Sequence, residues 1–286
     1  MRSLQEIEQR FIAWGQKEEN LRAAVVVGSQ ARLDHPADAW SDLDILLFAR
    51  SASLYQASTA WVEALAPVWV SIPSRTVAGE AERLVLFAGG LQVDFVFNDA
   101  SVLAGLAQMA ASGQLPEAVL RGVRVLFDKD QVIPPLPDPG KPSAQPPPNP
   151  ETFIRAWESF WFSAVHAAKQ LRRGDLAFYK GAEQGMRHLL LPFLEWCTRA
   201  ERGWDTDTWH NGRFIREWLD AASYTERAET YTPLESEACW RGLLRLVALF
   251  QRSARETAAA VGLVYPAEKD ASLAQFVQHL YETRET

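Results

Sequence analysis

Hydrophobic positions divide the chain into two halves with different periodicities. In the first half, short apolar runs rich in β-branched residues recur between polar turns, a pattern typical of strands. We expect strands at 23–27, 43–48, 68–72, 83–87, 91–97 and 123–127, and helices at 4–14, 54–65 and 101–109. The glycines at 89 and 90 predict a hairpin between two of these strands. This half should form a small mixed β-sheet with flanking helices.

From residue 151 onward, apolar residues recur at the three- and four-residue spacing of amphipathic helices. Phe153, Trp157, Phe160, Trp161 and Val165 fall on one stripe of the first such segment. The pattern predicts helices near 151–172, 175–199, 211–221, 235–260 and 270–283. We therefore predict an α+β fold in which an all-α helical-bundle domain follows the sheet domain.

A proline-rich stretch separates the two halves. Residues 134–150 read PPLPDPGKPSAQPPPNP and contain almost nothing that could pack in a core. Such a composition is typical of a semi-rigid, extended connector. The expected organisation is a first domain at 1–133, a linker at 134–150 and a second domain at 151–286.

Composition and charge narrow the class of protein. The net charge of −7 over 286 residues argues against nucleic acid as the main partner. The two cysteines, Cys197 and Cys239, are too few for a disulfide framework or a cysteine zinc site. No run reaches the roughly 18 apolar residues of a membrane span, and the charged N-terminus lacks a signal-peptide core. We expect a soluble, cytoplasmic protein without a membrane partner; the oligomeric state stays open.

The first candidate for chemistry is the turn after the strand at 23–27. Gly28 and Ser29 end this strand, and a helix is expected to follow. Backbone N–H groups at such a corner approach an anion closely, and a helix N-terminus adds a favourable dipole. Ser29 can donate its hydroxyl to a phosphate oxygen. Arg32 can neutralise another, although a surface salt bridge is the alternative interpretation. These three residues are the predicted nucleotide-binding residues.

Three aspartates form the second candidate site. Asp42 and Asp44 lie two positions apart where a strand opens, so they share one face while Leu43 and Ile45 point into the core. Asp94 interrupts an otherwise apolar strand, which is costly unless the charge is paired or ligates a metal. Carboxylate oxygens beside a triphosphate favour Mg²⁺. We predict that Asp42, Asp44 and Asp94 are the catalytic residues and hold Mg²⁺ for an in-line transfer.

This combination resembles the nucleotidyltransferase superfamily of the polymerase-β type. Other segments, in chain order, resemble the bacterial aminoglycoside 6-adenylyltransferases. These segments are Met1-Arg2-Ser3, Leu126-Phe127-Asp128-Lys129-Asp130, Lys141-Pro142-Ser143, Phe160-Trp161, Arg187-His188, Glu195-Trp196, Gly212-Arg213-Phe214 and Tyr265-Pro266. The resemblance implies a nucleotidyltransferase domain at 1–133, a helical acceptor-binding domain at 151–286, ATP as co-substrate with Mg²⁺, and transfer of AMP to a streptomycin hydroxyl.

One position departs from the family pattern. In that family the helix leading to the Arg-His pair carries an Asp, a candidate for binding the cationic drug or activating its hydroxyl. Alignment on Arg187-His188 puts Lys180 there. A lysine would repel cationic streptomycin, and Glu183, one turn further on, is the expected substitute. Lys180, Glu183 and Arg187 are therefore the candidate acceptor-binding residues.

Three functions remain compatible with the sequence. The leading hypothesis is an adenylyltransferase acting on an aminoglycoside-like antibiotic. A rival in the same superfamily would modify a different acceptor, such as a lincosamide, another small alcohol or a protein side chain, and Lys180 favours it. A non-catalytic nucleotide-binding relative is the third possibility, and the presence of all three aspartates argues against it.

Overall fold

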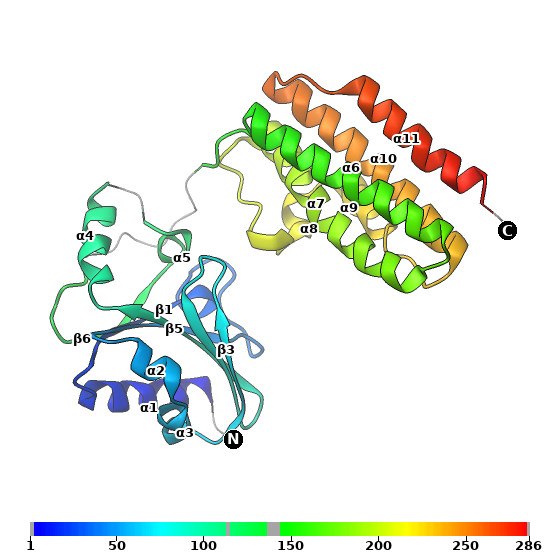
Figure 1. Ribbon diagram of the computed structural model, residues 1–286. Coiled ribbons are helices and arrows are strands. Elements are labelled where there is room, and N and C mark those ends of the chain that lie inside the picture. Colours follow the sequence, from blue (N-terminus) through cyan, green and yellow to red (C-terminus); the bar gives the residue numbers. More distant parts are fainter. Residues whose placement is uncertain (1–2, 113–114, 136–143, 285–286) are drawn as a thin grey trace. The chain divides into compact units, whose positions relative to one another are not determined.

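The chain folds into two units, each with its own hydrophobic core (Figure 1). The computed structural model describes residues 3–112, 115–135 and 144–284. The units are Met1–Pro142 and Ser143–Thr286, so the division falls within the proline-rich stretch 134–150. Residues 136–143 of that stretch lie outside the described residues, as do Met1 and Arg2.

A six-stranded mixed sheet forms the centre of the first unit, in the order β3-β4-β5-β2-β1-β6. Its strands are β1 (Leu21–Val27), β2 (Leu43–Ala49), β3 (Val68–Arg75), β4 (Ala81–Phe87), β5 (Leu91–Asp99) and β6 (Arg124–Asp128). β2 and β5 are parallel, and the other neighbouring pairs are antiparallel. The predicted mixed sheet is thus confirmed, and each expected strand is present.

Helices cover both faces of this sheet (Figure 1). On one face lie α1 (Leu4–Lys17), α2 (Ser53–Ala57) and α3 (Ala60–Leu65); on the other lie α4 (Val102–Ser112) and α5 (Glu117–Leu120). The single helix expected at 54–65 is two short helices. Ser58 adopts extended backbone between them, and its hydroxyl accepts a hydrogen bond from the Ala60 N–H, which competes with helix continuation.

The helix expected after Ser29 does not form, so that prediction was wrong. Only a single 3-10 turn, η1 (Gly28–Gln30), follows β1. His35 has a positive φ of 45°, and it precedes Pro36, a position that disfavours helical backbone. The chain instead runs through a loop, 31–42, into β2. The Gly28-Ser29 turn therefore offers backbone N–H groups without the dipole of a following α-helix.

The second unit is entirely helical in its described part. Its helices are α6 (Pro150–Arg172), α7 (Leu176–Arg202), α8 (Ile215–Trp218), α9 (Ala221–Ala228), α10 (Ser236–Val261) and α11 (Ala267–Glu282), with a 3-10 turn η2 (His210–Gly212). The four aromatic residues of the predicted stripe on α6 are buried and Val165 is partly buried. Phe160 stacks on Phe250 of α10 with ring centroids 3.7 Å apart. The helix expected at 211–221 is replaced by α8 and α9, because Asp220 caps a new helix start.

Among the described residues, no helix combines the length and apolar character that a membrane crossing requires.

Candidate active site

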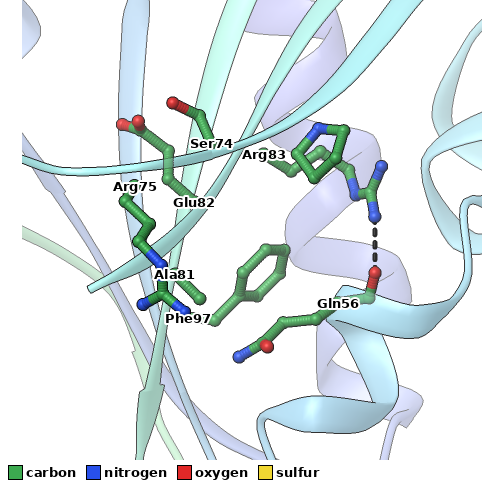
Figure 2. Close-up of a pocket in the computed structure, with 8 residues that line it drawn as sticks. Gln56, Ser74, Arg75, Ala81, Glu82, Arg83 and Phe97 are labelled. Atoms are coloured by element: carbon green, nitrogen blue, oxygen red, sulfur yellow. Dashed lines mark hydrogen bonds between the residues drawn. The ribbon is translucent and has the colours of Figure 1, made fainter. Parts of the chain in front are cut away.

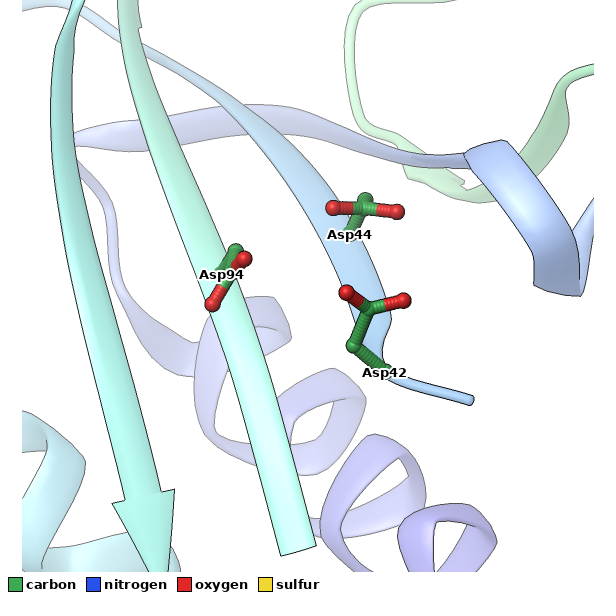
Figure 3. A group of neighbouring side chains, drawn as sticks. All are labelled: Asp42, Asp44 and Asp94. Carbon is green, nitrogen blue, oxygen red and sulfur yellow. The ribbon is translucent and has the colours of Figure 1, made fainter. Parts of the chain in front are cut away.

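The three predicted aspartates lie on one face of the sheet, where β1, β2 and β5 are adjacent. Val27 of β1 pairs with Asp44, and Asp44 pairs with Asp94 across the parallel β2–β5 ladder. Asp42 immediately precedes β2. One carboxylate oxygen from each aspartate lies within 4.8 Å of the others (Figure 3). Leu43, on the opposite face, is 1% exposed in the core.

The environment of Asp94 disfavours the charged form of its carboxyl group. It is 9% exposed. Burial raises the pKa of Asp94 to about 6, and the charges of Asp42 and Glu82 add to this, whereas hydrogen bonds from Gln92 oppose it. Gln92 Nε2 lies 3.2 Å from both Asp94 oxygens. Three converging carboxylates, one of them disfavoured as an anion, fit a hard divalent cation such as Mg²⁺.

The turn beside this cluster comes very close to Asp44 and carries a buried hydroxyl group. Gly28 has φ +71°, and a Cβ at this position would collide with the Asp44 carboxylate. Only glycine therefore allows β1 to end so close to Asp44. Ser29 is 7% exposed, and its hydroxyl oxygen has no hydrogen-bond partner among the described residues. A buried, unsatisfied hydroxyl next to carboxylates that could hold a cation suits a phosphate oxygen.

Arg32 has a structural contact within the loop that links the turn to β2. Its Nε donates a hydrogen bond of 2.6 Å to the carbonyl oxygen of His35. Arg121, just after α5, lies 4.0 Å from the Asp34 carboxylate and connects the same loop to the rest of the unit. The role of Arg32 in phosphate binding stays a prediction.

The structure also brings Lys180, Glu183 and Arg187 together, on α7 in the second unit. Glu183 is 3% exposed and lies between two cations: Arg187 Nη2 at 2.8 Å and Lys180 Nζ at 3.0 Å. The hydroxyls of Thr232 and Tyr179 also donate to it, at 3.0 and 3.3 Å. We call these five residues the α7 network. Its carboxylate is already neutralised internally.

Lys180 and Arg187 also donate hydrogen bonds to the segment between α9 and α10, and so hold it against α7. Lys180 Nζ donates to the Thr232 carbonyl oxygen at 2.5 Å, and Arg187 Nη2 donates to the Thr230 carbonyl oxygen at 2.8 Å. The Arg187 guanidinium lies 3.8 Å from the centre of the Tyr231 ring. Lys180 is the member that solvent reaches, with 24% of its side chain exposed.

Three residues near the carboxylates were not predicted from the sequence. Gln92 donates hydrogen bonds to Asp94. The two residues lie two positions apart on one strand, a spacing from which a shared face could have been predicted. Glu82 lies on β4, the strand next to Asp94. Its side chain shares a face with Asp94, and the only sequence signal for this was the alternation of polar and apolar residues along Ala81–Phe87. Trp40, two residues before Asp42, is 93% exposed on a turn in which its N–H donates to Asp38. An exposed tryptophan has no sequence signature of its own.

Comparisons with known proteins bear on the whole chain. A family profile described as streptomycin adenylyltransferase matches residues 1–280, a span that includes every candidate site residue. An aminoglycoside 6-adenylyltransferase of Bacillus subtilis (strain 168) is 22% identical over 294 residues, covering 98% of this chain and 99% of its own. One from Campylobacter jejuni is 22% identical over 275 residues, covering 93% and 92%. A crystal structure of an aminoglycoside 6-adenyltransferase from Bacillus subtilis aligns with a TM-score of 0.47 and 18% identity, over 98% of this chain and 99% of that one.

Proposed function

Because the chain belongs to the streptomycin adenylyltransferase family, and is accordingly a nucleotidyltransferase, we propose that it transfers AMP from ATP to a hydroxyl of an aminoglycoside-like antibiotic of the streptomycin type, with Mg²⁺. One observation supports this most directly. Three carboxylates converge within 4.8 Å, beside a turn whose buried Ser29 hydroxyl has no partner among the described residues.

In the proposed reaction, Asp42, Asp44 and Asp94 hold the Mg²⁺, which when bound neutralises charge on the triphosphate and activates the acceptor hydroxyl. Ser29 and the backbone N–H groups of the Gly28-Ser29 turn bind phosphate oxygens, with Arg32 as a further cation. The acceptor oxygen forms a bond to the α-phosphorus while the bond from that phosphorus to the bridging oxygen breaks. Pyrophosphate leaves with the electron pair, and the hydroxyl proton is released.

The α7 network is the proposed contact for the acceptor on the second unit. Glu183 shares its charge between Lys180 and Arg187, so the three residues together carry one net positive charge. Such a group suits hydroxyl and ether oxygens of the acceptor better than its ammonium groups. Lys180, the most exposed of the three, is the residue we propose for this contact.

The test is transfer itself. The protein is incubated with ATP, Mg²⁺ and each member of an aminoglycoside panel that includes streptomycin. Mass spectrometry should find one adenylyl group added to the acceptor, with release of pyrophosphate. Asp42→Asn and Asp44→Asn serve as matched controls and should abolish the product. An acceptor panel without any adenylylated member would contradict the proposed substrate class, and a lincosamide or a protein would then be tested in its place.

A further inference from the structure

A cavity of about 410 Å³ opens on the carboxylate-bearing face of the sheet in the first unit. Its floor is apolar and includes Val25, Leu46, Phe48 and Val96, while α4 and α5 contribute one wall. The turn between β3 and β4 contributes the other wall. The volume lies within the range of small-molecule sites. Asp44 lines this cavity and also belongs to the aspartate cluster, so the cavity adjoins the place where transfer would occur.

The charged residues at this cavity all carry the same sign. Asp44, Glu80 and Glu82 line it, and its described lining contains no lysine, arginine or histidine. Glu80 lies at the β3–β4 turn, where the Thr76 hydroxyl donates to its carboxylate at 2.5 Å. An acidic lining over an apolar floor is complementary to a cation with an apolar body.

Glu82 is not neutralised by the arginine next to it in sequence. Figure 2 shows the carboxylate of Glu82 and the guanidinium of Arg83 pointing in opposite directions from neighbouring positions of β4. Arg83 is 6% exposed and donates instead to the Gln56 carbonyl oxygen at 2.5 Å and the Ser71 hydroxyl at 3.1 Å. In the described parts of the chain, no basic side chain forms an ion pair with Glu82. Its charge is therefore available to a ligand.

Glu82 also lies close to the aspartate cluster. Across the β4–β5 ladder, Glu82 pairs with Val96 and Leu84 pairs with Asp94. Glu82 is thus the diagonal neighbour of Asp94 on the same face, and such neighbours are separated by roughly 7–8 Å, with a somewhat shorter distance between their Cβ atoms. A ligand cation at Glu82 would place adjacent hydroxyl groups of the same molecule beside Asp44 and Asp94.

We propose that this cavity is the subsite for a cationic group of the acceptor, with Glu82 as its principal carboxylate and Glu80 as a second. The assignment rests on the proposed adenylyl transfer. The acceptor's ammonium or guanidinium group binds Glu82, and the apolar face of its ring lies on the floor formed by Leu46 and Val96. Glu183, the acidic candidate on the second unit, is already paired with Lys180 and Arg187, whereas Glu82 has no such cation among the described residues.

The experiment uses the full chain and streptomycin, whose guanidinium groups provide the cation, as the probe. Calorimetry without nucleotide measures the dissociation constant for streptomycin, and steady-state kinetics measures KM for streptomycin and for ATP. Glu82→Gln should raise both streptomycin constants about tenfold, and the effect should shrink at high salt. Leu106→Trp, which adds bulk from α4, should raise them similarly. Both variants should keep KM for ATP within about twofold of wild type.

Glu63→Gln is the matched control, because Glu63 is an exposed carboxylate on α3, which covers the opposite face of the same sheet. It should leave all three constants unchanged. Unchanged streptomycin binding in Glu82→Gln would overturn the subsite, as would a selective rise in KM for ATP, which would assign the cavity to the nucleotide. Wild-type protein that fails to bind streptomycin would overturn it too. Binding of streptomycin that depends on Glu82, without transfer to it, would support the subsite and contradict the proposed function.

Discussion

Asp94 lies in a strand whose other central residues are apolar, and its buried charge lowers the stability of the folded protein by an amount that can be measured. Burial raises the pKa of Asp94 from 3.8 to about 6, helped by the charges of Asp42 and Glu82. A carboxyl group whose pKa is raised on folding binds its proton more tightly in the folded state. Its contribution to stability is therefore full at acidic pH, below about 4, and is lost as the pH rises through about 6.

We accordingly predict that Asp94→Asn stabilises the metal-free protein at pH 7.5 but not at pH 4.5. The expected gain is about 1–2 kcal/mol, less than a full conversion of the pKa shift because solvent partly screens the carboxylate. Urea unfolding in EDTA at the two pH values measures it. Saturating Mg²⁺ should stabilise wild type more than the variant. Equal stability of the two proteins at pH 7.5 would contradict this account of Asp94.

Gly28 and Ser29 give the second prediction at this scale. Ser29→Ala removes a donor to the phosphates and should weaken ATP binding by about 1.5–3 kcal/mol in calorimetry with Mg²⁺. Gly28→Ala should be more damaging to transfer, because a methyl group at φ +71° meets the Asp44 carboxylate. Gly105→Ala is the control, since a Cβ there has no neighbour within 4 Å. Wild-type transfer by Gly28→Ala would disprove the close approach.

At the scale of single elements, a buried carboxylate on α7, Glu183, pairs with Lys180 and Arg187 of the same helix. Both cations also donate hydrogen bonds that hold α7 to the chain segment before α10. Glu183→Gln would leave Lys180 and Arg187 without their shared carboxylate, and Arg187 is only 3% exposed. Removing one partner of a buried pair typically costs about 3–5 kcal/mol. We therefore predict a loss of about 3 kcal/mol in the free energy of unfolding for Glu183→Gln, measured with urea.

A matched surface pair is available on α6. Glu151 and Arg155 lie 2.6 Å apart with side chains 77% and 75% exposed, so Glu151→Gln should change stability by no more than about 0.5 kcal/mol. Lys180→Met should lower the free energy of unfolding by an amount between those of Glu151→Gln and Glu183→Gln, because Arg187 still pairs with Glu183. If Glu183→Gln cost no more than Glu151→Gln, the α7 network would not be a stabilising element, and its carboxylate would be available for other contacts.

At the scale of the whole molecule, the two units have separate hydrophobic cores, and a proline-rich segment connects them. We predict that limited proteolysis cuts first within 134–150 and yields two fragments, each about half of the chain, that resist further digestion. Mass spectrometry of the earliest fragments locates the cut. A first cut inside 151–260 would argue against a separate helical unit. A single cooperative melt would leave the prediction intact, because the units can unfold at similar temperatures.

Most helices and strands could be predicted from the sequence, because the spacing of apolar residues within a short segment indicates its secondary structure. Apolar runs predicted the six strands, and the four-residue spacing predicted the long helices α6, α7 and α10 within a few residues. The predictions of a helix after Ser29 and of a single helix at 211–221 were wrong. In those places a proline or a capping aspartate changed the backbone, and neither effect is visible in hydrophobic spacing.

For the candidate site, the sequence by itself determined that Asp42 and Asp44 share a face, because alternate residues of a strand point the same way. The sequence also predicted that Asp94 joins them, from a charge inside an apolar strand, but the physical reason lies in the tertiary structure, where β2 and β5 pair in parallel with Asp44 opposite Asp94. Only the tertiary structure decided the surroundings of Glu183, whose partner Thr232 is 49 residues away, and of Glu82, whose neighbours come from another strand. Spacing along the chain fixes direction within an element, whereas charge balance depends on which distant elements pack together.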